Sequence, residues 1–114
     1  MNREIKFRAW DSISKEMHQW DKIKNIPLSN FQMYEHYTLM QFTELTDKNG
    51  VKIFEGDVLT NHQNKKGLIV FDEGKFCIET KRQNNTVWFM PLDKGFLKNK
   101  EIIGNIYENK NLIL

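Results

Sequence analysis

Residues 57–107 read DVLTNHQNKKGLIVFDEGKFCIETKRQNNTVWFMPLDKGFLKNKEIIGNIY, and this stretch decides the fold that we expect. Apolar, β-branched and aromatic residues fall in five short runs spaced about ten residues apart, a pattern typical of small β-domains. We expect strands at 58–61, 68–72, 76–80, 86–90 and 102–107. Glu73-Gly74 is short enough for a two-residue hairpin loop. The stretch therefore predicts a mainly β fold with an SH3-like, partly open barrel.

Upstream of this barrel, the chain begins with a pattern that predicts a β-hairpin. Ile5, Phe7 and Ala9 alternate with charged residues, which is the period of a half-buried strand. A polar turn follows at 11–15, and residues 16–20 return as the second strand. We expect a loop at 21–30, where Pro27 interrupts both regular patterns. The pattern at 31–37 fits either a short strand or an irregular turn.

Turn residues organise the middle of the chain. Asn49 and Gly50, after the extended segment 39–42, form the dipeptide that favours positive φ at both central positions of a tight turn. Gly56 predicts a bend, and Asp57 is expected to bond neighbouring backbone amides there. One short helix is expected within 92–98 or after Asn109. We interpret 1–114 as one domain: hairpin and central segment (1–56), barrel (57–107) and tail (108–114).

Composition restricts the class of protein. The chain has 114 residues, a net charge of +2 and one cysteine, so it fits one domain without disulfides. The sequence contains no apolar run near the ~20 residues of a membrane helix, and its charged N-terminus is unlike a secretory signal. These features predict a cytoplasmic protein with no membrane association.

The residues that could do chemistry predict neither an enzyme nor a metal or cofactor site. Cys77 has no basic neighbour in sequence that would activate a thiol. The three histidines are too dispersed for paired metal-ligand spacing: His18, His36 and His62. Glu55 and Asp57 could form an acid–base pair, but no nucleophile or phosphate-binding loop accompanies them.

Binding surfaces are the remaining possibility, and two sets of residues suggest one. Aromatic residues at the strand ends are candidates for a protein or subunit interface: Trp10, Trp20 and Tyr107. A second set could contact nucleic acid, because lysines cluster around an aromatic ring: Lys94, Phe96, Lys98 and Lys100. The other inter-strand loops add the basic pairs Lys65-Lys66 and Lys81-Arg82.

Five motifs carry a resemblance to a known family. They are KFRAWD (6–11), LMQFT (39–43), DKNG (47–50), IFEGDV (53–58) and IGNIYEN (103–109). In this order they resemble the YopX family. The resemblance implies a β-rich protein with an SH3-like portion, encoded by a phage or prophage of a low-GC Gram-positive bacterium. It also implies a homo-oligomer, and it assigns no catalytic residues.

The chain departs from the family pattern at three positions. Glu44 stands where the family usually has Gly, Phe54 where Tyr is more usual, and Lys110 where Pro often begins the last segment. The recurring residues have structural roles in turns and strands: Asn49, Gly50, Gly56, Asp57 and Gly104.

Together these observations predict a non-enzymatic accessory protein. It would act by protein–protein binding and self-assembly, including the modulation of a bacterial host protein. The alternative is a nucleic-acid-binding accessory protein that uses the basic inter-strand loops.

Overall fold

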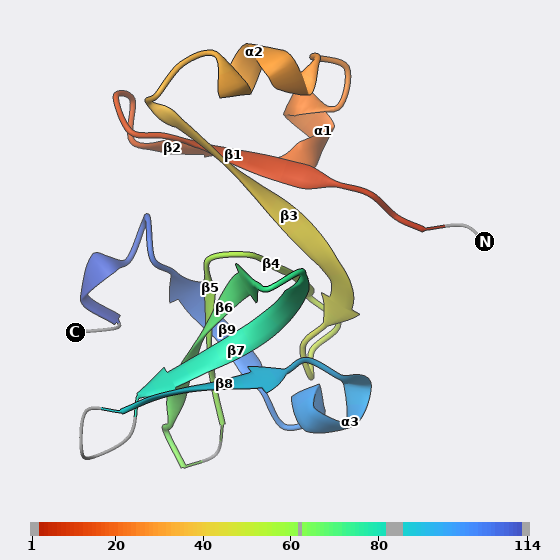
Figure 1. The fold of residues 1–114 in the computed structure, drawn as a ribbon, viewed down its shortest axis with the longest axis vertical. Coiled ribbons are helices and arrows are strands. Elements are labelled where there is room, and N and C mark those ends of the chain that lie inside the picture. The colour runs from red at the N-terminus through yellow and green to blue at the C-terminus, as the bar shows by residue number, and fades with distance from the viewer. Residues whose placement is uncertain (1–2, 62, 82–85, 113–114) are drawn as a thin grey trace.

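The fold consists of two antiparallel sheets, and one long strand of the first sheet runs toward the second (Figure 1). The computed structural model describes residues 3–61, 63–81 and 86–112. The first sheet has the order β2-β1-β3-β4 and contains β1 (Phe7–Asp11), β2 (Glu16–His18), β3 (Tyr37–Thr46) and β4 (Lys52–Phe54). The second has the order β8-β7-β6-β5-β9 and contains β5 (Asp57–Thr60), β6 (Lys66–Asp72), β7 (Lys75–Lys81), β8 (Val87–Pro91) and β9 (Glu101–Asn105).

The predicted mainly β, partly open barrel fold is confirmed. The second sheet curls into a half-barrel, with β8 and β9 at its two edges. Its core contains five buried residues: Ile53, Leu59, Ile69, Ile78 and Leu97. Each of the five expected strands is present, although the last one ends at Asn105 and residues 106–107 turn away.

A short helix lies beside the opening of the half-barrel. This helix, α3 (Lys94–Leu97), falls within the segment where a helix was expected. Asp93 accepts a hydrogen bond from the Phe96 amide at 2.8 Å, which caps the first turn. The cap allows Leu97 to enter the core, so a four-residue helix is stabilised by packing.

The first sheet differs from the expectation in its helices. The second strand was predicted to reach Trp20, but it ends at His18, and Trp20 begins α1 (Trp20–Ile23). The predicted loop contains α1 and the start of α2 (Leu28–Gln32), which extends into the undecided segment 31–37. Neither helix is long enough to show a helical pattern in sequence. Both form because Ile23 and Phe31 pack with Ala9 on one face of the sheet.

The N-terminal hairpin is part of a larger sheet that packs against the half-barrel. β1 pairs with both β2 and the ten-residue β3, and β3 then runs toward the second sheet (Figure 1). The face of β1 that points away from the helices contacts the half-barrel. There Trp10 stacks on Tyr107, with ring centroids 6.0 Å apart.

The two tight turns that the sequence predicts, at Glu73-Gly74 and Asn49-Gly50, differ in how well their observed φ angles match the prediction. Glu73 and Gly74 both have positive φ, 49° and 81°, as the predicted two-residue hairpin requires. At Asn49-Gly50 the expectation was wrong in part, because only Gly50 has positive φ. Asp47 stabilises this turn instead, accepting hydrogen bonds from the amides of Asn49 (2.8 Å) and Val51 (3.0 Å).

In the described ranges, every helix is too short or too polar to cross a membrane. The concave side of the half-barrel holds an open groove.

Candidate functional site

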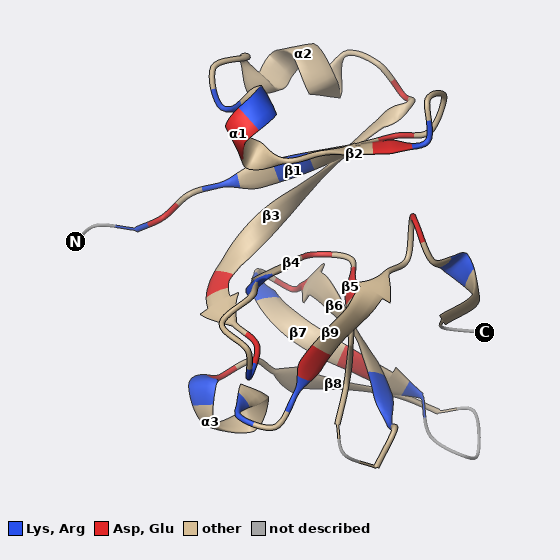
Figure 2. Cartoon of the chain, turned by 180° about the vertical axis from the view of Figure 1, so that it is seen from behind, with Lys and Arg blue, Asp and Glu red and all other residues tan. Residues whose placement is uncertain are grey.

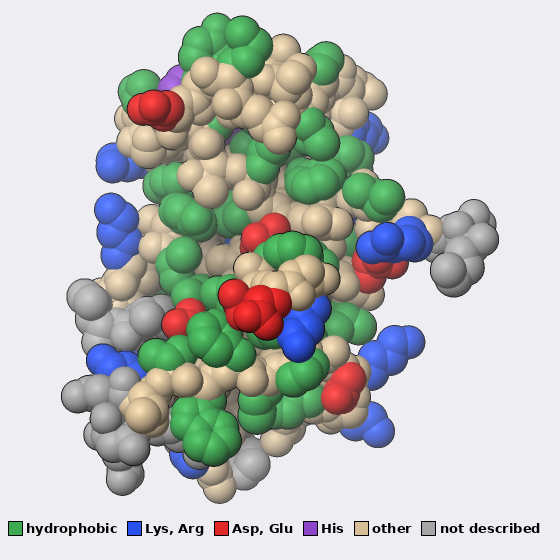
Figure 3. Space-filling view, viewed as in Figure 1, with side chains coloured by type: hydrophobic (Ala, Val, Ile, Leu, Met, Phe, Trp, Pro, Cys, Tyr) green, Lys and Arg blue, Asp and Glu red, His purple; other side chains and the backbone are tan. Residues whose placement is uncertain are grey.

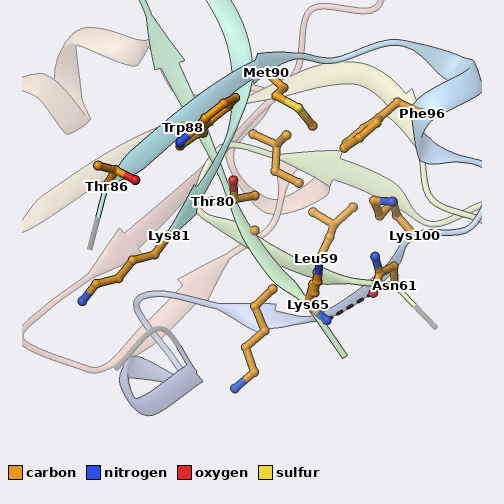
Figure 4. Close-up of a pocket in the computed structure, with 13 residues that line it drawn as sticks. Leu59, Asn61, Lys65, Thr80, Lys81, Thr86, Trp88, Met90, Phe96 and Lys100 are labelled. Carbon is orange, nitrogen blue, oxygen red and sulfur yellow. Dashed lines mark hydrogen bonds between the residues drawn. The ribbon is translucent and has the colours of Figure 1, made fainter. Parts of the chain in front are cut away.

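The concave side of the half-barrel forms an open groove of about 930 Å³ (Figure 4). Strands β5 to β8, α3 and the segment before β9 contribute to it. Its described lining residues are Leu59, Asn61, Lys65, Lys66, Gly67, Ile78, Thr80, Lys81, Thr86, Trp88, Met90, Phe96 and Lys100. The volume lies within the range of ~300–1,000 Å³ that is usual for ligand sites.

The groove is strongly basic. Four of its described lining residues are lysines, and none is Asp or Glu. Lys65 comes from the turn before β6, Lys66 from the start of β6, Lys81 from the end of β7, and Lys100 from the segment before β9. Elsewhere basic and acidic segments are mixed in both sheets (Figure 2). Although the net charge of the chain is only +2, positive charge is concentrated at the groove.

Apolar side chains line the groove together with the lysines. Trp88 and Phe96 lie at the groove from β8 and α3, with Met90 between them (Figure 4). Trp88 is 52% exposed, although a large aromatic side chain is usually buried. The ammonium of Lys100 lies 4.4 Å from the centroid of the Phe96 ring, a cation–π contact. The groove thus offers positive charge and flat apolar surface together.

Local hydrogen bonds hold one rim of the groove. Asn61 Oδ1 accepts from the amides of Gln63 (2.9 Å) and Lys65 (3.1 Å), which orders the turn before β6 (Figure 4). Gly67 leaves room for Ile78 on the floor, because a Cβ at position 67 would come within 2.5 Å of Ile78 Cγ1.

The structure brings together some of the predicted nucleic-acid candidates. Phe96 and Lys100 line the groove, whereas Lys94 and Lys98 do not. Sequence inspection missed Trp88. Trp88 lies opposite Thr80 on β7, and this pairing, which no local sequence pattern specifies, places both residues at the groove. The basic pair Lys81-Arg82 contributes Lys81, and Arg82 lies outside the described residues.

The predicted interface aromatics are located at contacts within the chain. Trp10 is only 7% exposed and stacks on the half-buried Tyr107. Trp20 packs beside the cluster of Ala9, Ile23 and Phe31. Trp10 therefore offers little surface to a partner in this conformation, whereas Trp20 and Tyr107 remain partly exposed.

The carboxylates near Gly56 brace the backbone. Glu55 Oε1 accepts from the Gln41 amide at 2.9 Å, and Asp57 Oδ2 accepts from the Phe54 amide at 2.8 Å. Asp57 Oδ1 also accepts from Arg8 Nη2 at 2.8 Å, a partner that sequence inspection missed. Burial raises the pKa of Asp57, although the charge of Arg8 opposes this shift.

Among the residues that the structure describes, neither the candidate metal ligands nor the cysteine forms a reactive site. No three His, Cys, Asp or Glu side chains there are grouped to hold a metal ion. Cys77 is buried at 1% exposure, and His62 falls outside the described residues.

A second cleft, of about 550 Å³, lies between the two sheets. Three basic residues line it, Lys6, Arg8 and Lys52, but Asp21 and Asp57 are also present. Because these charges are mixed, the cleft makes a weaker case for an anionic ligand than the groove does.

Comparison with known proteins establishes the family. The family model described as YopX protein matches residues 6–114. The chain belongs to the YopX family. Among solved structures, it is similar to the crystal structure of protein EF1440 from Enterococcus faecalis, with 25% identity and a TM-score of 0.67. That alignment covers 99% of this chain and 100% of the other. No curated protein sequence matches the chain.

The structure shows the surroundings of the three residues that depart from the expected family pattern, Glu44, Phe54 and Lys110. Glu44 adopts a φ of 71°, the left-handed region in which glycine is favoured. Phe54 is buried, and its ring centroid lies 4.9 Å from the Arg8 guanidinium carbon. Lys110 begins a 3₁₀ turn, η1 (Lys110–Leu112).

Proposed function

We propose that this protein is a non-enzymatic nucleic-acid-binding protein that holds the phosphate backbone in the lysine-lined groove. The observation that supports this most is the convergence of four lysines, with no carboxylate among the described lining residues. These lysines come from three separate parts of the second sheet and its loops. A cleft lined by charges of one sign raises the local concentration of oppositely charged ligands, which supports an anionic ligand here.

Phosphate contacts of this kind make a quantitative prediction. Each lysine that neutralises a phosphate releases counterions, so affinity falls as salt rises. With four lysines engaged on a single strand, the slope of log K against log salt concentration is expected to be about −3. Binding would be insensitive to sequence, because phosphate contacts carry no base information.

The experiment is a fluorescence-anisotropy titration of labelled oligonucleotides at several salt concentrations. The test variant, Lys65→Glu with Lys66→Glu, reverses two exposed groove charges. The matched control, Lys22→Glu with Lys24→Glu, makes the same change in net charge at exposed residues of α1 and its C-cap. We expect the groove variant to lose about tenfold in affinity or more, and the control to lose much less.

Two outcomes would overturn this proposal. Equal losses in the groove and control variants would mean that only net charge matters. No binding of any oligonucleotide at low salt would exclude the function. Circular dichroism and chemical unfolding of each variant check that the fold persists.

A second function, protein binding through self-assembly, is favoured by an apolar edge strand. β8 lies at the edge of the second sheet, with Val87 46% and Phe89 49% exposed. Hydrophobic side chains also gather over the face shown in Figure 3. Natural proteins usually protect such edges, and a second copy of the chain could pair with this one.

Sedimentation tests the second function. If β8 pairs with another copy, Phe89→Lys dissociates the oligomer, whereas Ile13→Lys does not. Ile13 is a suitable control because it is 74% exposed in the β1–β2 turn, away from β8. A wild-type protein that sediments as a monomer at high concentration would rule this function out.

The family resemblance supplies the biological setting of both functions. A phage or prophage origin, a cytoplasmic location and a bacterial host protein as target are predictions of that resemblance. A pull-down from host lysate, with and without nuclease, would distinguish binding of a host protein from binding of nucleic acid. A host protein that is retained after nuclease treatment binds directly.

A further inference from the structure

The apolar side chains at the groove favour a ligand that has apolar groups as well as negative charge. Leu59, Ile78 and Met90 line the groove together with the rings of Trp88 and Phe96. Leu59 and Ile78 are buried beneath this surface, whereas Trp88 is exposed and Met90 and Phe96 are partly exposed. A ligand that contacts only the lysines would leave the exposed parts of these three side chains in water. The favourable ligand therefore combines phosphates with flat, apolar groups, and unpaired nucleic-acid bases are such groups.

We propose that the groove takes single-stranded nucleic acid, with bases stacked on Trp88 and Phe96 and the backbone held by the surrounding lysines. This proposal rests on the proposed nucleic-acid-binding function and names its substrate class. The stacking surfaces belong to β8 and α3, which lie on either side of Met90 at the groove (Figure 4). Every base presents a π-face, so such stacking tolerates different sequences.

A double helix fits this site poorly for a physical reason. In a duplex, the faces of the bases are covered by their neighbours, and a protein meets phosphates and base edges. The groove is about 930 Å³, a size suited to a small molecule or a few bases. A duplex could touch the lysines at the rim but would not cover Trp88, Met90 and Phe96.

The arrangement of the lysines also suits one strand. Lys100 lies over the Phe96 ring at 4.4 Å, so a cation and a stacking surface occur at the same place. Lys65 precedes β6, Lys66 begins it, Lys81 ends β7, and all three line the groove. Figure 4 shows Lys65 and Lys81 at different sides of it. A strand with bases inward and phosphates outward would satisfy both sets of residues.

The test compares one labelled sequence in three forms: single strand, duplex with its complement, and a single strand of abasic residues. Wild-type protein, Trp88→Ala and the conservative Trp88→Phe are titrated with each. Phe71→Ala is the matched control, because Phe71 is also 52% exposed and lies outside the groove lining. Intrinsic fluorescence gives a second readout, since Trp10 is buried and Trp88 is exposed.

We expect the single strand to bind at least tenfold more tightly than the duplex or the abasic strand. Trp88→Ala is expected to lose about tenfold in single-strand affinity, the scale of one lost base stack, with the salt slope unchanged. Trp88→Phe should restore most of the affinity, and Phe71→Ala should bind like wild type.

The two proposals fail in different ways. Equal binding of single strand and duplex, or an unchanged affinity of Trp88→Ala, would overturn the stacking proposal. If the lysine variant still lost affinity in that case, the nucleic-acid function would survive. If no form of the oligonucleotide bound at low salt, both proposals would be wrong.

Discussion

The guanidinium of Arg8 and the carboxylate of Asp57 form a buried ion pair of 2.8 Å that joins β1 of one sheet to β5 of the other. Their side chains are only 8% and 4% exposed. Arg8 Nη2 also donates to the carbonyl of Glu55 at 3.0 Å, while Asp57 holds the Phe54 amide. The pair therefore links the two sheets and the bend at Gly56 in one network.

We expect either single change, Arg8→Met or Asp57→Asn, to destabilise the fold by about 3 kcal/mol, because each leaves a buried charge without the opposite charge beside it. The double variant should be less unstable than the sum of the two. Chemical unfolding of all four proteins measures this coupling. Additive losses would show that the two side chains act independently.

The second prediction concerns the effect of Tyr107 ionisation on stability at alkaline pH. Burial and the nearby charge of Glu55 raise the pKa of Tyr107 above its ordinary value of 10.0. Above pH 10, the unfolded chain loses the phenol proton before the folded chain does, so unfolding becomes easier as pH rises. We expect Tyr107→Phe to remove this part of the alkaline loss of stability.

Unfolding midpoints between pH 8 and pH 11 measure the effect, with the wild type and Tyr107→Phe compared at each pH. Lysine titration affects both proteins alike, so only their difference is informative. A difference that stays constant over the range would contradict the prediction.

Glu44 provides a third prediction, because it holds a left-handed conformation with φ of 71°. Glu44→Gly should stabilise the fold by up to about 1 kcal/mol by relieving this strain. The ion pair with Arg3 is lost, but it is 58% and 35% exposed and contributes little. Glu44→Ala is the control, since it removes the ion pair and keeps the Cβ.

Thermal unfolding distinguishes the two variants at position 44. The glycine variant should melt above wild type and the alanine variant at or below it. If both variants melted at the same temperature, the conformation at residue 44 would not be a source of strain.

The fourth prediction is that Gly104→Ala disrupts the end of β9. An added Cβ would come within 2.5 Å of Asn109 Oδ1 and 2.7 Å of Leu112 Cδ1, so the C-terminal turn must move. We expect a loss of about 1–3 kcal/mol, as for other overpacked sites. Urea unfolding gives the value.

Gly95→Ala is the matched control for this change. Gly95 lies in α3, and its nearest contact for an added Cβ is Asp93 Oδ1 at 3.4 Å. Alanine favours helix more than glycine, so this variant should gain up to about 1 kcal/mol. A Gly104→Ala variant as stable as Gly95→Ala would show that the turn adapts freely.

Local patterns predicted the second sheet because its elements depend on neighbours in sequence. The short apolar runs in β6 and β7 and the turn at Glu73-Gly74 specify a hairpin without any distant contact. The bend at Gly56 and the cap at Asp93 are likewise local. The helices α1 and α2 were missed because four or five residues carry no helical pattern, and packing on the first sheet stabilises them.

The candidate site could be predicted only in part. Phe96 and Lys100 are near one another in sequence, and their clustering with other lysines is visible there. Lys65, Lys81 and Trp88 join them because β6, β7 and β8 pair in a curled sheet. Trp10 seemed a surface residue by its position at a strand end, but packing with Tyr107 buries it.

The sequence by itself determined the class of fold, the strands of the half-barrel and the family, because alternation, turn residues and motif order are properties of short segments. Only the tertiary structure decided which side chains share a surface. The Arg8–Asp57 pair spans 49 residues, and the groove collects residues from 59 to 100. Such contacts depend on how the sheets curl and pack, which no local pattern specifies.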